Sequence, residues 1–276
     1  MKTLVWTTLL YTTTTCSNLL ENFNDWTETL NSQRDSLVVF IDFAKAFDLV
    51  SIPKLLSKLV SVGVSGMLLS CIKSMLTDRS QRVRVRETLS VSRPVRSGVP
   101  QGSVIGPIFV LLFINDIIFS LPPAARSKLF ADDIKSYMIL SGDLCTTNFS
   151  LLLDSIVNWS AKWQLPLSVN KCGWMLISNR IYDRELKFNL AGHPLTKLTE
   201  VKDLGVLYTS DLSFTPHILS IVSKAKQRSF LIRKSFTNSC CTALILAFKT
   251  YVLPLLDYCS PIWSPYQVLD ILKIES

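Results

Sequence analysis

The sequence predicts an α+β fold, because segments with helical spacing of apolar residues are interspersed with short β-branched runs. The segment 16–34 repeats apolar side chains about every third or fourth position, as a helix does. SLVVFID at 36–42 is instead a continuous apolar run that is too short for a helix, and it predicts a buried strand. No internal repeat or low-complexity linker interrupts the 276 residues, which are enough for one large domain or two ordinary ones.

Two helices are expected after this strand. IPKLLSKLVSVG carries Pro53 near its start, where a proline costs little because that backbone N–H has no helical partner. SGMLLSCIKSMLTD (65–78) predicts the second helix. QRVRVRE (81–87) then changes to the alternation that is typical of a strand.

The middle of the chain predicts a turn, a long helix and a hairpin. RPVRSGVPQGS (93–103) contains two prolines and two glycines, and Ser103 can cap an apolar helix that extends to about Ser120. KLFADD and IKSYMIL, within 128–140, are short apolar runs on either side of two aspartates, which indicates a β-hairpin. The remaining expected elements are a helix at 149–163, strands at 172–178, 186–190 and 203–208, and two C-terminal helices.

Composition favours a polyanionic partner. Lys and Arg outnumber Asp and Glu by 29 to 21, giving a net charge of +8. The seven cysteines form no CxxC pair, and His193 and His217 have no partner at metal-ligand spacing, so neither a zinc site nor a disulfide framework is expected. MKTLVWTTLLY imitates a signal peptide without a small-x-small cleavage pattern, and apolar runs such as 104–114 are shorter than the ~20 residues of a membrane span. We therefore expect an intracellular protein of the cytoplasm or nucleus that does not enter a membrane.

Two acidic sites at strand ends are the main chemical signal. Asp42 closes SLVVFID, and the pair Asp132–Asp133 lies in LFADDI. Carboxylates beside apolar runs are costly to desolvate, and divalent metal compensates them well. Two Mg²⁺ ions ~3.5–4 Å apart can activate an attacking hydroxyl and stabilise a leaving pyrophosphate. The alternative is a set of solvated turn aspartates, which either site considered alone would favour.

Taken together, longer motifs resemble a known family. VFIDFAKAFD, SGVPQGSVIGPIFVLLFINDI and KLFADD resemble, in order and spacing, three successive motifs of reverse transcriptases of the non-LTR (LINE-type) retrotransposons. WSAKWQLPLSVNKC, VKDLGVLYTSDLSF and LPLLDYCSPIW extend the resemblance over roughly residues 12–266. The resemblance implies a right-hand polymerase palm, an antiparallel sheet with helices, that acts as an RNA-directed DNA polymerase. It also implies residual fingers at 1–35, a palm with connecting fingers elements at 36–212, and a partial thumb at 213–276.

The resemblance then implies roles in metal binding and catalysis. Asp42 and Asp132 would be the principal ligands of two Mg²⁺ ions, which Mn²⁺ could replace, and Asp133 a supporting ligand. The backbone carbonyl of Phe43 would also face a metal. Lys171, in SVNKC, matches a lysine that the family uses near the pyrophosphate leaving group, whereas a lone lysine is more often only solvated.

Nucleotide contacts are implied in the same way. Phe47 corresponds to the family's steric gate, a ring placed where a ribose 2′-hydroxyl would sit, although a core aromatic would have the same spacing. Gln101 would hydrogen-bond the incoming dNTP. Gly98 and Gly102 would let the backbone approach a ligand closely, and the helix that begins near Ser103 would offer free N–H groups.

Basic segments predict contact with an RNA template and a DNA primer. The alternation in QRVRVRE predicts a strand with arginines on one face and valines on the other. Such a strand could face the phosphates of a nucleic acid. A solvated edge strand would have the same sequence pattern. The arginines are Arg82, Arg84 and Arg86. Beyond residue 213 an expected helix has an apolar stripe, with basic residues largely off it, among them Lys224, Lys226 and Arg228. Leu204–Gly205 in KDLGV matches the family's primer-grip hairpin.

Part of the family's pattern is missing from this sequence. Only Lys2 and Arg34 are basic before Asp42, so the cationic fingers that clamp a triphosphate have no counterpart, and no endonuclease domain or zinc knuckle is present. We therefore expect a truncated copy, with little polymerase activity, of a longer parent polyprotein that carries those parts. Two other interpretations stay open: a catalytically inactive or domesticated remnant that binds nucleic acid, and a secreted protein cleaved near Ser17.

Overall fold

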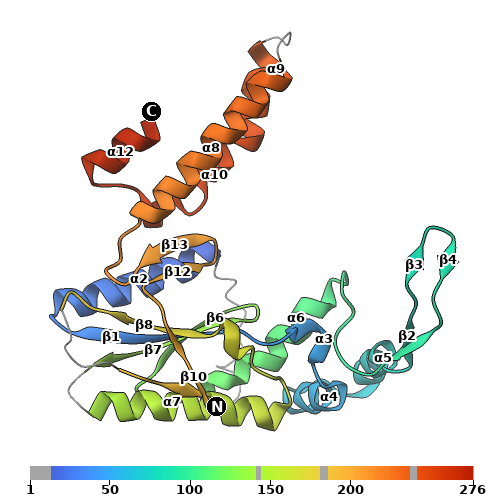
Figure 1. Cartoon of the computed structure of the whole chain (residues 1–276). Helices are drawn as coiled ribbons and strands as arrows, with labels where there is room; N and C mark the ends of the chain where they lie inside the picture. The colour runs from blue at the N-terminus through green and yellow to red at the C-terminus, as the bar shows by residue number, and fades with distance from the viewer. Residues whose placement is uncertain (1–13, 141–143, 181–185, 237–240, 276) are drawn as a thin grey trace. The chain divides into compact units, whose positions relative to one another are not determined.

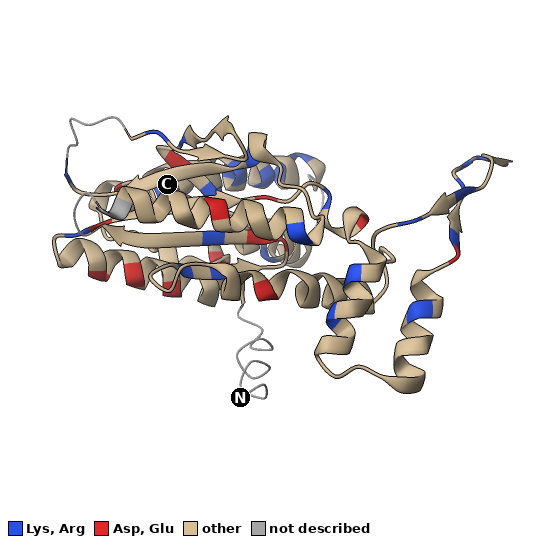
Figure 2. Cartoon of the chain, turned by 90° about the horizontal axis from the view of Figure 1, so that it is seen from below, with Lys and Arg blue, Asp and Glu red and all other residues tan. Residues whose placement is uncertain are grey.

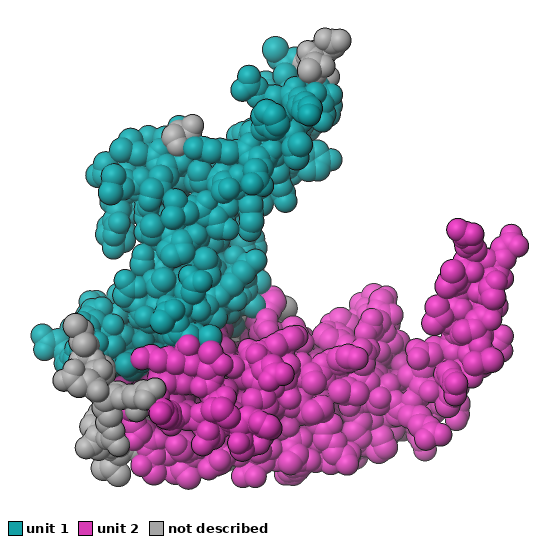
Figure 3. Space-filling model, viewed as in Figure 1, with its two compact units in different colours: residues 1–36, 175–181, 198–276 teal, residues 37–174, 182–197 magenta. Residues whose placement is uncertain are grey.

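The structure is a computed structural model that describes residues 14–140, 144–180, 186–236 and 241–275. The chain divides into two compact units (Figure 3). The units, each assembled from separate stretches of sequence, are Met1–Ser36, Met175–Ile181 and Leu198–Ser276 for the first, and Leu37–Trp174 and Tyr182–Lys197 for the second. The expected fingers, palm and thumb follow the chain in order instead, and their boundaries stay predictions.

A five-stranded sheet in the order β11-β8-β1-β7-β6 organises the α+β fold (Figure 1). Its strands are β1 (Asp35–Ile41), β6 (Arg126–Phe130), β7 (Asp133–Leu140), β8 (Gly173–Ile177) and β11 (Thr196–Lys197). β1 lies in the middle, and six of its seven residues are buried, which explains its continuous apolar run. β6 and β7 form the expected antiparallel hairpin. β11 pairs in parallel with β8, so the sheet is mixed and not purely antiparallel.

The second unit also contains helices and 3₁₀ segments. They are α3 (Ala46–Leu49), α4 (Ile52–Ser61), α5 (Gly66–Leu76), α6 (Ile105–Ile114), the 3₁₀ segments η1 (Asn115–Ser120) and η2 (Val169–Lys171), and α7 (Leu144–Trp163). α7 runs along one face of the sheet and contacts β7 (Figure 1). Its residues Phe149, Leu152 and Ile156 are fully buried at spacings of three and four, as the inner face of an amphipathic helix requires.

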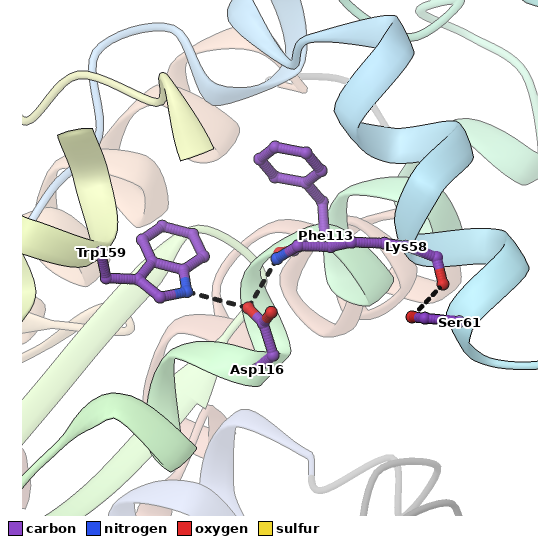
Figure 4. A network of polar contacts seen from close by, with 5 residues as sticks. All are labelled: Lys58, Ser61, Phe113, Asp116 and Trp159. Atoms are coloured by element: carbon purple, nitrogen blue, oxygen red, sulfur yellow. Dashed lines mark hydrogen bonds and ion pairs between the residues drawn. The ribbon is translucent and has the colours of Figure 1, made fainter. Parts of the chain in front are cut away.

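A buried lysine joins α4 to η1 and α7. Lys58 is 6% exposed, and its ammonium donates to Asp116 Oδ1 at 2.5 Å and to the carbonyl oxygen of Phe113. The indole N–H of Trp159 also donates to Asp116, at 2.9 Å (Figure 4). The ammonium lies 3.7 Å from the ring centroid of Trp163, which is a cation–π distance. Burial lowers the pKa of Lys58 to about 8, although its hydrogen bond to Asp116 acts in the opposite direction.

A two-stranded arm follows α5 (Figure 1). β2 (Arg79–Gln81) pairs with β5 (Arg93–Val95), and further out β3 (Arg84–Val85) pairs with β4 (Thr88–Leu89). Residues 81–94 are exposed throughout. The expected single strand at 81–87 is therefore wrong in detail, because the chain leaves strand geometry after β2 and turns at Arg86, whose φ is +55°.

The first unit is mainly helical in the part of it that the structure describes. Its elements are α2 (Thr15–Asn31), β12 (Glu200–Asp203), β13 (Val206–Thr209), α8 (Thr215–Ser235), α9 (Cys241–Tyr251), α10 (Leu253–Asp257), α11 (Ser260–Trp263) and α12 (Val268–Glu275). Phe23 packs edge-to-face on Tyr208 with ring centroids 4.8 Å apart, and on Trp26 at 5.4 Å. Trp26 and Tyr208 are fully buried, so α2 and β13 share a core.

The expected helices at 16–34, 52–63, 65–78 and 149–163 are confirmed. The expected strand at 203–208 is wrong, since the chain reverses there in the β12–β13 hairpin. The strand expected at 186–190 is reduced to β9 (Asn189–Leu190), which pairs with β10 (His193–Pro194). The two expected C-terminal helices are replaced by α8 to α12.

The remaining expectations concern thiols, histidine and membranes. The described cysteines with free thiols are Cys16, Cys71, Cys172, Cys241 and Cys259. His217 is buried, and burial lowers its pKa to about 4, in keeping with a structural role. Among the described helices, none is long and apolar enough to cross a bilayer. The signal-like segment 1–11 lies outside the described residues.

Candidate active site

Three aspartates lie at the ends of two neighbouring strands. Asp42 directly follows β1, and Asp133 is the first residue of β7, which is hydrogen-bonded next to β1 in the sheet. Asp132 lies in the two-residue turn between β6 and β7, after Ala131 at φ +53°. A two-residue hairpin turn with positive φ reverses the chain tightly, so the turn aspartate and the strand aspartate stay together.

The side chain of Lys171 lies close to these carboxylates. Its Nζ is 3.0 Å from Asp42 Oδ2, an ion pair in which Lys171 is 72% exposed and Asp42 23% exposed. Contact with Asp42 and the charge of that carboxylate raise the pKa of Lys171, and Asp132 and Asp133 add smaller contributions in the same direction. All four sequence-predicted catalytic residues are therefore gathered in one place.

Backbone contacts fix Asp42 against the segment that carries Lys171. The Ser168 N–H donates to the Asp42 carbonyl oxygen at 2.8 Å, and the Ala44 N–H donates to the Pro166 carbonyl oxygen at 2.8 Å. The Asp42 N–H donates to the Cys172 sulfur at 3.4 Å. These bonds place residues 42–44 beside residues 166–172, which explains how residues far apart in sequence form one site.

Phe43 and Cys172 support this arrangement from below the surface. The Phe43 ring is 2% exposed and lies 5.7 Å from the Trp159 ring, so its side chain belongs to the core. Its expected contact with a metal through the backbone carbonyl stays a prediction. Cys172 is buried, and its sulfur accepts the hydrogen bond from the Asp42 N–H. Sequence reasoning missed this role, because the only signal for Cys172 is its position beside Lys171.

A second group of predicted residues lines a cavity in the same unit. The cavity has a volume of about 500 Å³. Its lining residues are Phe47, Pro100, Gln101, Gly102, Ser103, Val104 and Pro107. The three nucleotide-binding residues that the family resemblance implies, Phe47, Gln101 and Gly102, are therefore brought together.

The loop that carries Gln101 is held against α3 by backbone contacts. The Val99 N–H donates to the Phe47 carbonyl oxygen at 2.8 Å, and the Gly98 N–H donates to the Val50 carbonyl oxygen at 2.8 Å. A Cβ at Gly98, whose φ is +78°, would lie 2.6 Å from the Asp48 carbonyl oxygen. The close approach at Gly98 is therefore to the backbone of α3 and not to a ligand, which corrects the expectation from sequence.

Gln101, Gly102 and Ser103 differ in their surroundings. Gly102 has φ +77° and open space around its Cα. Ser103 Oγ accepts from the Gly106 N–H at 3.1 Å, so it binds a free N–H at the start of α6, although the N-cap residue is Val104 and not Ser103 as expected. The Gln101 amide donates to Asp48 Oδ1 at 2.6 Å. Asp48 was not singled out from the sequence, where its only signal is that it follows Phe47.

The arginines of the arm do not lie on one strand face as expected. Arg84 is in β3, whereas Arg82 lies between β2 and β3, and Arg86 lies in the turn. Val83 and Val85 are as exposed as their neighbours, at 65% and 67%, so neither side of the arm is covered. Positively charged segments occur along the arm (Figure 2).

The predicted basic helix and primer-grip turn lie in the first unit. In α8 the apolar stripe is confirmed, since Ile218, Ile221 and Ala225 are buried. The basic residues on its exposed surface include Lys224, Lys226 and Arg228. Leu204 and Gly205 form the turn between β12 and β13, at φ +44° and +90°.

The donor chemistry of the aspartate cluster fits a divalent cation, because carboxylate oxygens are the ligands that Mg²⁺ prefers. Asp42 Oδ2 is buried, and the Lys171 ammonium lies 3.0 Å from it. Across the described residues, however, no three His, Cys, Asp or Glu side chains are arranged closely enough to hold a metal ion. Binding by all three aspartates would therefore require side-chain movement, including displacement of Lys171 from Asp42.

Comparison with known proteins connects this site to a family. The family model described as reverse transcriptase (RNA-dependent DNA polymerase) matches residues 6–230. The chain is 28% identical over 239 residues to the probable RNA-directed DNA polymerase from transposon BS of Drosophila melanogaster, covering 82% of this chain and 25% of that protein. It is 31% identical over 209 residues to the RNA-directed DNA polymerase from mobile element jockey of Drosophila funebris, covering 72% and 22% respectively.

Solved structures of telomerase are also similar to the chain. Telomerase from Candida albicans, in complex with a TWJ fragment of telomeric RNA, has a TM-score of 0.47 at 12% identity, covering 94% of this chain and 46% of that chain. Apo telomerase from Candida tropicalis has a TM-score of 0.48 at 11% identity, covering 91% and 47%.

The chain spans about a quarter of the length of the polymerases that it matches. The region matched by the family nevertheless includes the whole aspartate cluster, the cavity and the exposed Lys224, Lys226 and Arg228 of α8. The chain therefore belongs to the reverse transcriptase (RNA-dependent DNA polymerase) family, and its curated relatives are polymerases of non-LTR retrotransposons.

Proposed function

We propose that the chain carries the catalytic palm of an RNA-directed DNA polymerase, which joins a dNTP to a primer 3′-hydroxyl opposite an RNA template. The observation that carries the proposal is the convergence of Asp42, Asp132 and Asp133 on Lys171, in a member of the reverse transcriptase family. When bound, two Mg²⁺ or Mn²⁺ ions would supply positive charge that activates the hydroxyl and stabilises the departing pyrophosphate.

The aspartates would hold these ions at the end of the sheet. Asp42 follows the central strand β1, and Asp133 begins the neighbouring β7, so both start from a rigid backbone. Lys171 keeps its proton on Nζ, because the aspartates raise its pKa, and it is exposed. It can therefore stabilise or protonate the leaving pyrophosphate from the solvent side of the cluster.

The cavity beside α3 would receive the dNTP. Its volume of about 500 Å³ lies within the ~300–1,000 Å³ that is usual for small-molecule sites. The Phe47 ring would occupy the space next to C2′ of the sugar and so exclude a 2′-hydroxyl. Gln101 would hydrogen-bond the nucleotide, and the open space at Gly102 would let the ligand approach the backbone.

Two basic surfaces would hold the template and the primer through their phosphates. Residues 78–96, which form the arm, contain six arginines against two acidic residues. Arg82, Arg84 and Arg86 are among these arginines, and all three are exposed. The exposed cations of α8 include Lys224, Lys226 and Arg228, and the Leu204–Gly205 turn would contact the primer strand.

Primer extension on an RNA template tests the proposal. The 276-residue chain, and the same chain joined to the upstream segment of a related polymerase, would be given dNTPs with Mg²⁺ or Mn²⁺. Extension that Asp132→Asn abolishes, and that the exposed-surface control Asp154→Asn does not change, supports the assignment. Extension that survives Asp132→Asn, or its absence from both proteins when they are folded, contradicts it.

A second candidate function is nucleic-acid binding without catalysis. One observation favours it: within the described ranges the acidic side chains do not form a ready three-ligand metal site, and Lys171 neutralises Asp42. This candidate predicts salt-dependent binding of a primer–template duplex with no metal-dependent extension. Primer extension by the 276-residue chain and by its extended form, each with and without Asp132→Asn, therefore distinguishes the two functions.

A further inference from the structure

Asp48 lies beside the nucleotide cavity without lining it. It belongs to the single-turn helix α3, next to Phe47, and its side chain is exposed. Its Oδ1 accepts the hydrogen bond from Gln101 Nε2 at 2.6 Å. Gln101 does line the cavity, so Asp48 can influence a ligand there only through the amide that it holds.

The chemistry of this contact fixes the orientation of the amide. A carboxylate can only accept hydrogen bonds, whereas the two ends of a glutamine amide differ, since the NH₂ donates and the oxygen accepts. The NH₂ group of Gln101 must therefore face Asp48. Its carbonyl oxygen and its second N–H are left for another partner. An asparagine at position 48 could satisfy either orientation, so the negative charge itself selects one.

The contact does not hold the loop in place, because the backbone already does so. Gly98 and Val99 donate to carbonyl oxygens of residues 50 and 47, both at 2.8 Å, and Ser97 Oγ donates to the Asp48 carbonyl oxygen at 2.8 Å. These bonds involve the backbone of α3 and would survive loss of the Asp48 carboxylate. The Asp48 carboxylate adds only a restriction on the side chain of Gln101.

We propose that Asp48 is a positioning residue, which holds the Gln101 amide in the one orientation that presents its carbonyl oxygen and second N–H to a deoxynucleoside triphosphate in the cavity. This inference rests on the proposed function, because it assumes that a dNTP is the ligand. Immobilising a flexible side chain on binding costs ~0.5–1.5 kcal/mol, which is equivalent to roughly 2- to 12-fold in affinity. Holding Gln101 beforehand avoids part of that cost.

The decisive experiment is a double-mutant cycle on dTTP binding by the full chain with Mg²⁺, measured by isothermal titration calorimetry. Asp48→Ala should weaken binding about three- to tenfold, and Asp48→Asn should weaken it less, because the hydrogen bond persists without a fixed orientation. In a Gln101→Ala background, Asp48→Ala should have no further effect. The matched control Asp154→Ala, an exposed aspartate of α7, should leave binding unchanged.

A spectroscopic measurement distinguishes positioning from a structural role. The side-chain amide signals of the six glutamines can be followed in the ¹⁵N-labelled chain, and Gln101→Ala identifies the relevant pair. Asp48→Ala should shift that pair while the backbone spectrum of residues 97–99 stays in place. If Asp48→Ala weakens dTTP binding equally with glutamine or with alanine at position 101, the positioning role of Asp48 is wrong. The same holds if Asp48→Ala leaves the Gln101 amide signals unchanged. In either case the proposed function still stands. Absence of dTTP binding by the unmodified chain contradicts the proposed function, and the inference then fails with it.

Discussion

Replacing Lys58 by methionine removes one buried charge and nearly preserves the shape of the side chain, so it isolates what that charge does to stability. The ammonium is surrounded by the rings of Phe113, Trp159 and Trp163, at 4.6, 4.9 and 3.7 Å from their centroids. Its counter-ion, Asp116, is 37% exposed and keeps the hydrogen bond from the Trp159 indole when the lysine is gone. Water can therefore compensate the aspartate in the variant.

The pKa of Lys58 sets both the sign and the size of the expected effect. Burial lowers it from 10.5 to about 8 in the folded chain, so between these pH values the unfolded chain binds more protons than the folded one. The free energy of unfolding must then rise with pH across that window, by up to about 1.4 kcal/mol per pH unit and about 3 kcal/mol in all. Below pH 8 Lys58 is charged in both the folded and the unfolded chain, so burial of its charge destabilises the folded chain by the full amount.

Urea unfolding at pH 7, 8, 9 and 10, followed by tryptophan fluorescence, measures this dependence. The free energy of unfolding of the unmodified chain should rise by about 2–3 kcal/mol relative to Lys58→Met between pH 7 and pH 10. Taking the difference removes the titration of cysteines and tyrosines that both proteins share. Lys73→Met, at an exposed position of α5, is the matched control for replacing a lysine by methionine. A constant difference for Lys58→Met would refute the reasoning, because Lys58 would then titrate as an exposed lysine does.

Four further results are expected of the site. Mg²⁺ or Mn²⁺ should raise the melting temperature, since a ligand of the native state stabilises it, and Asp132→Asn with Asp42→Asn should remove most of the shift; an unchanged shift would contradict the carboxylate assignment. Lys171→Met should tighten Mn²⁺ binding several-fold, measured by electron paramagnetic resonance of free Mn²⁺, because no ammonium then competes for Asp42; equal or weaker binding would show that the pair does not compete. Phe47→Val should narrow the preference for dTTP over UTP in competition binding, and unchanged discrimination would leave Phe47 a packing residue. Primer–template affinity should depend less steeply on salt when alanine replaces Lys224, Lys226 and Arg228, by up to about 0.9 in the logarithmic slope for each phosphate that these cations neutralise.

Elements with a strong local signal could be predicted from the sequence. β1 is recognisable because a strand buried on both faces needs a continuous apolar run, and α4 because Pro53 is tolerated in a first turn. The β6–β7 hairpin follows from two short apolar runs separated by two residues. The residues of the aspartate cluster and the cavity are predicted from the resemblance of their motifs to the reverse transcriptase family, although these motifs are far apart in the sequence.

Contacts between distant segments could not be predicted. Nothing near Lys58 in the sequence shows that three aromatic rings from α6 and α7 will enclose it, since its position in α4 is equally compatible with a solvated lysine. The Asp48–Gln101 bond and the Cys172 contact with Asp42 likewise depend on how segments pack. The prediction of a single strand in the arm is wrong for a different reason. Alternation predicts a strand but does not show where a pair of strands will turn.

The ion pair between Asp42 and Lys171 reduces the repulsion among the carboxylates of the aspartate cluster. Three carboxylates that approach one another repel, and each is stabilised by a nearby cation. Lys171 supplies that cation from an exposed position, on a flexible side chain that costs little to move into water. A more buried lysine in this place would compete strongly with a divalent ion. The exposed position of Lys171 is compatible with the proposed function, in which its ammonium would leave Asp42 when metal binds and would then contact the pyrophosphate.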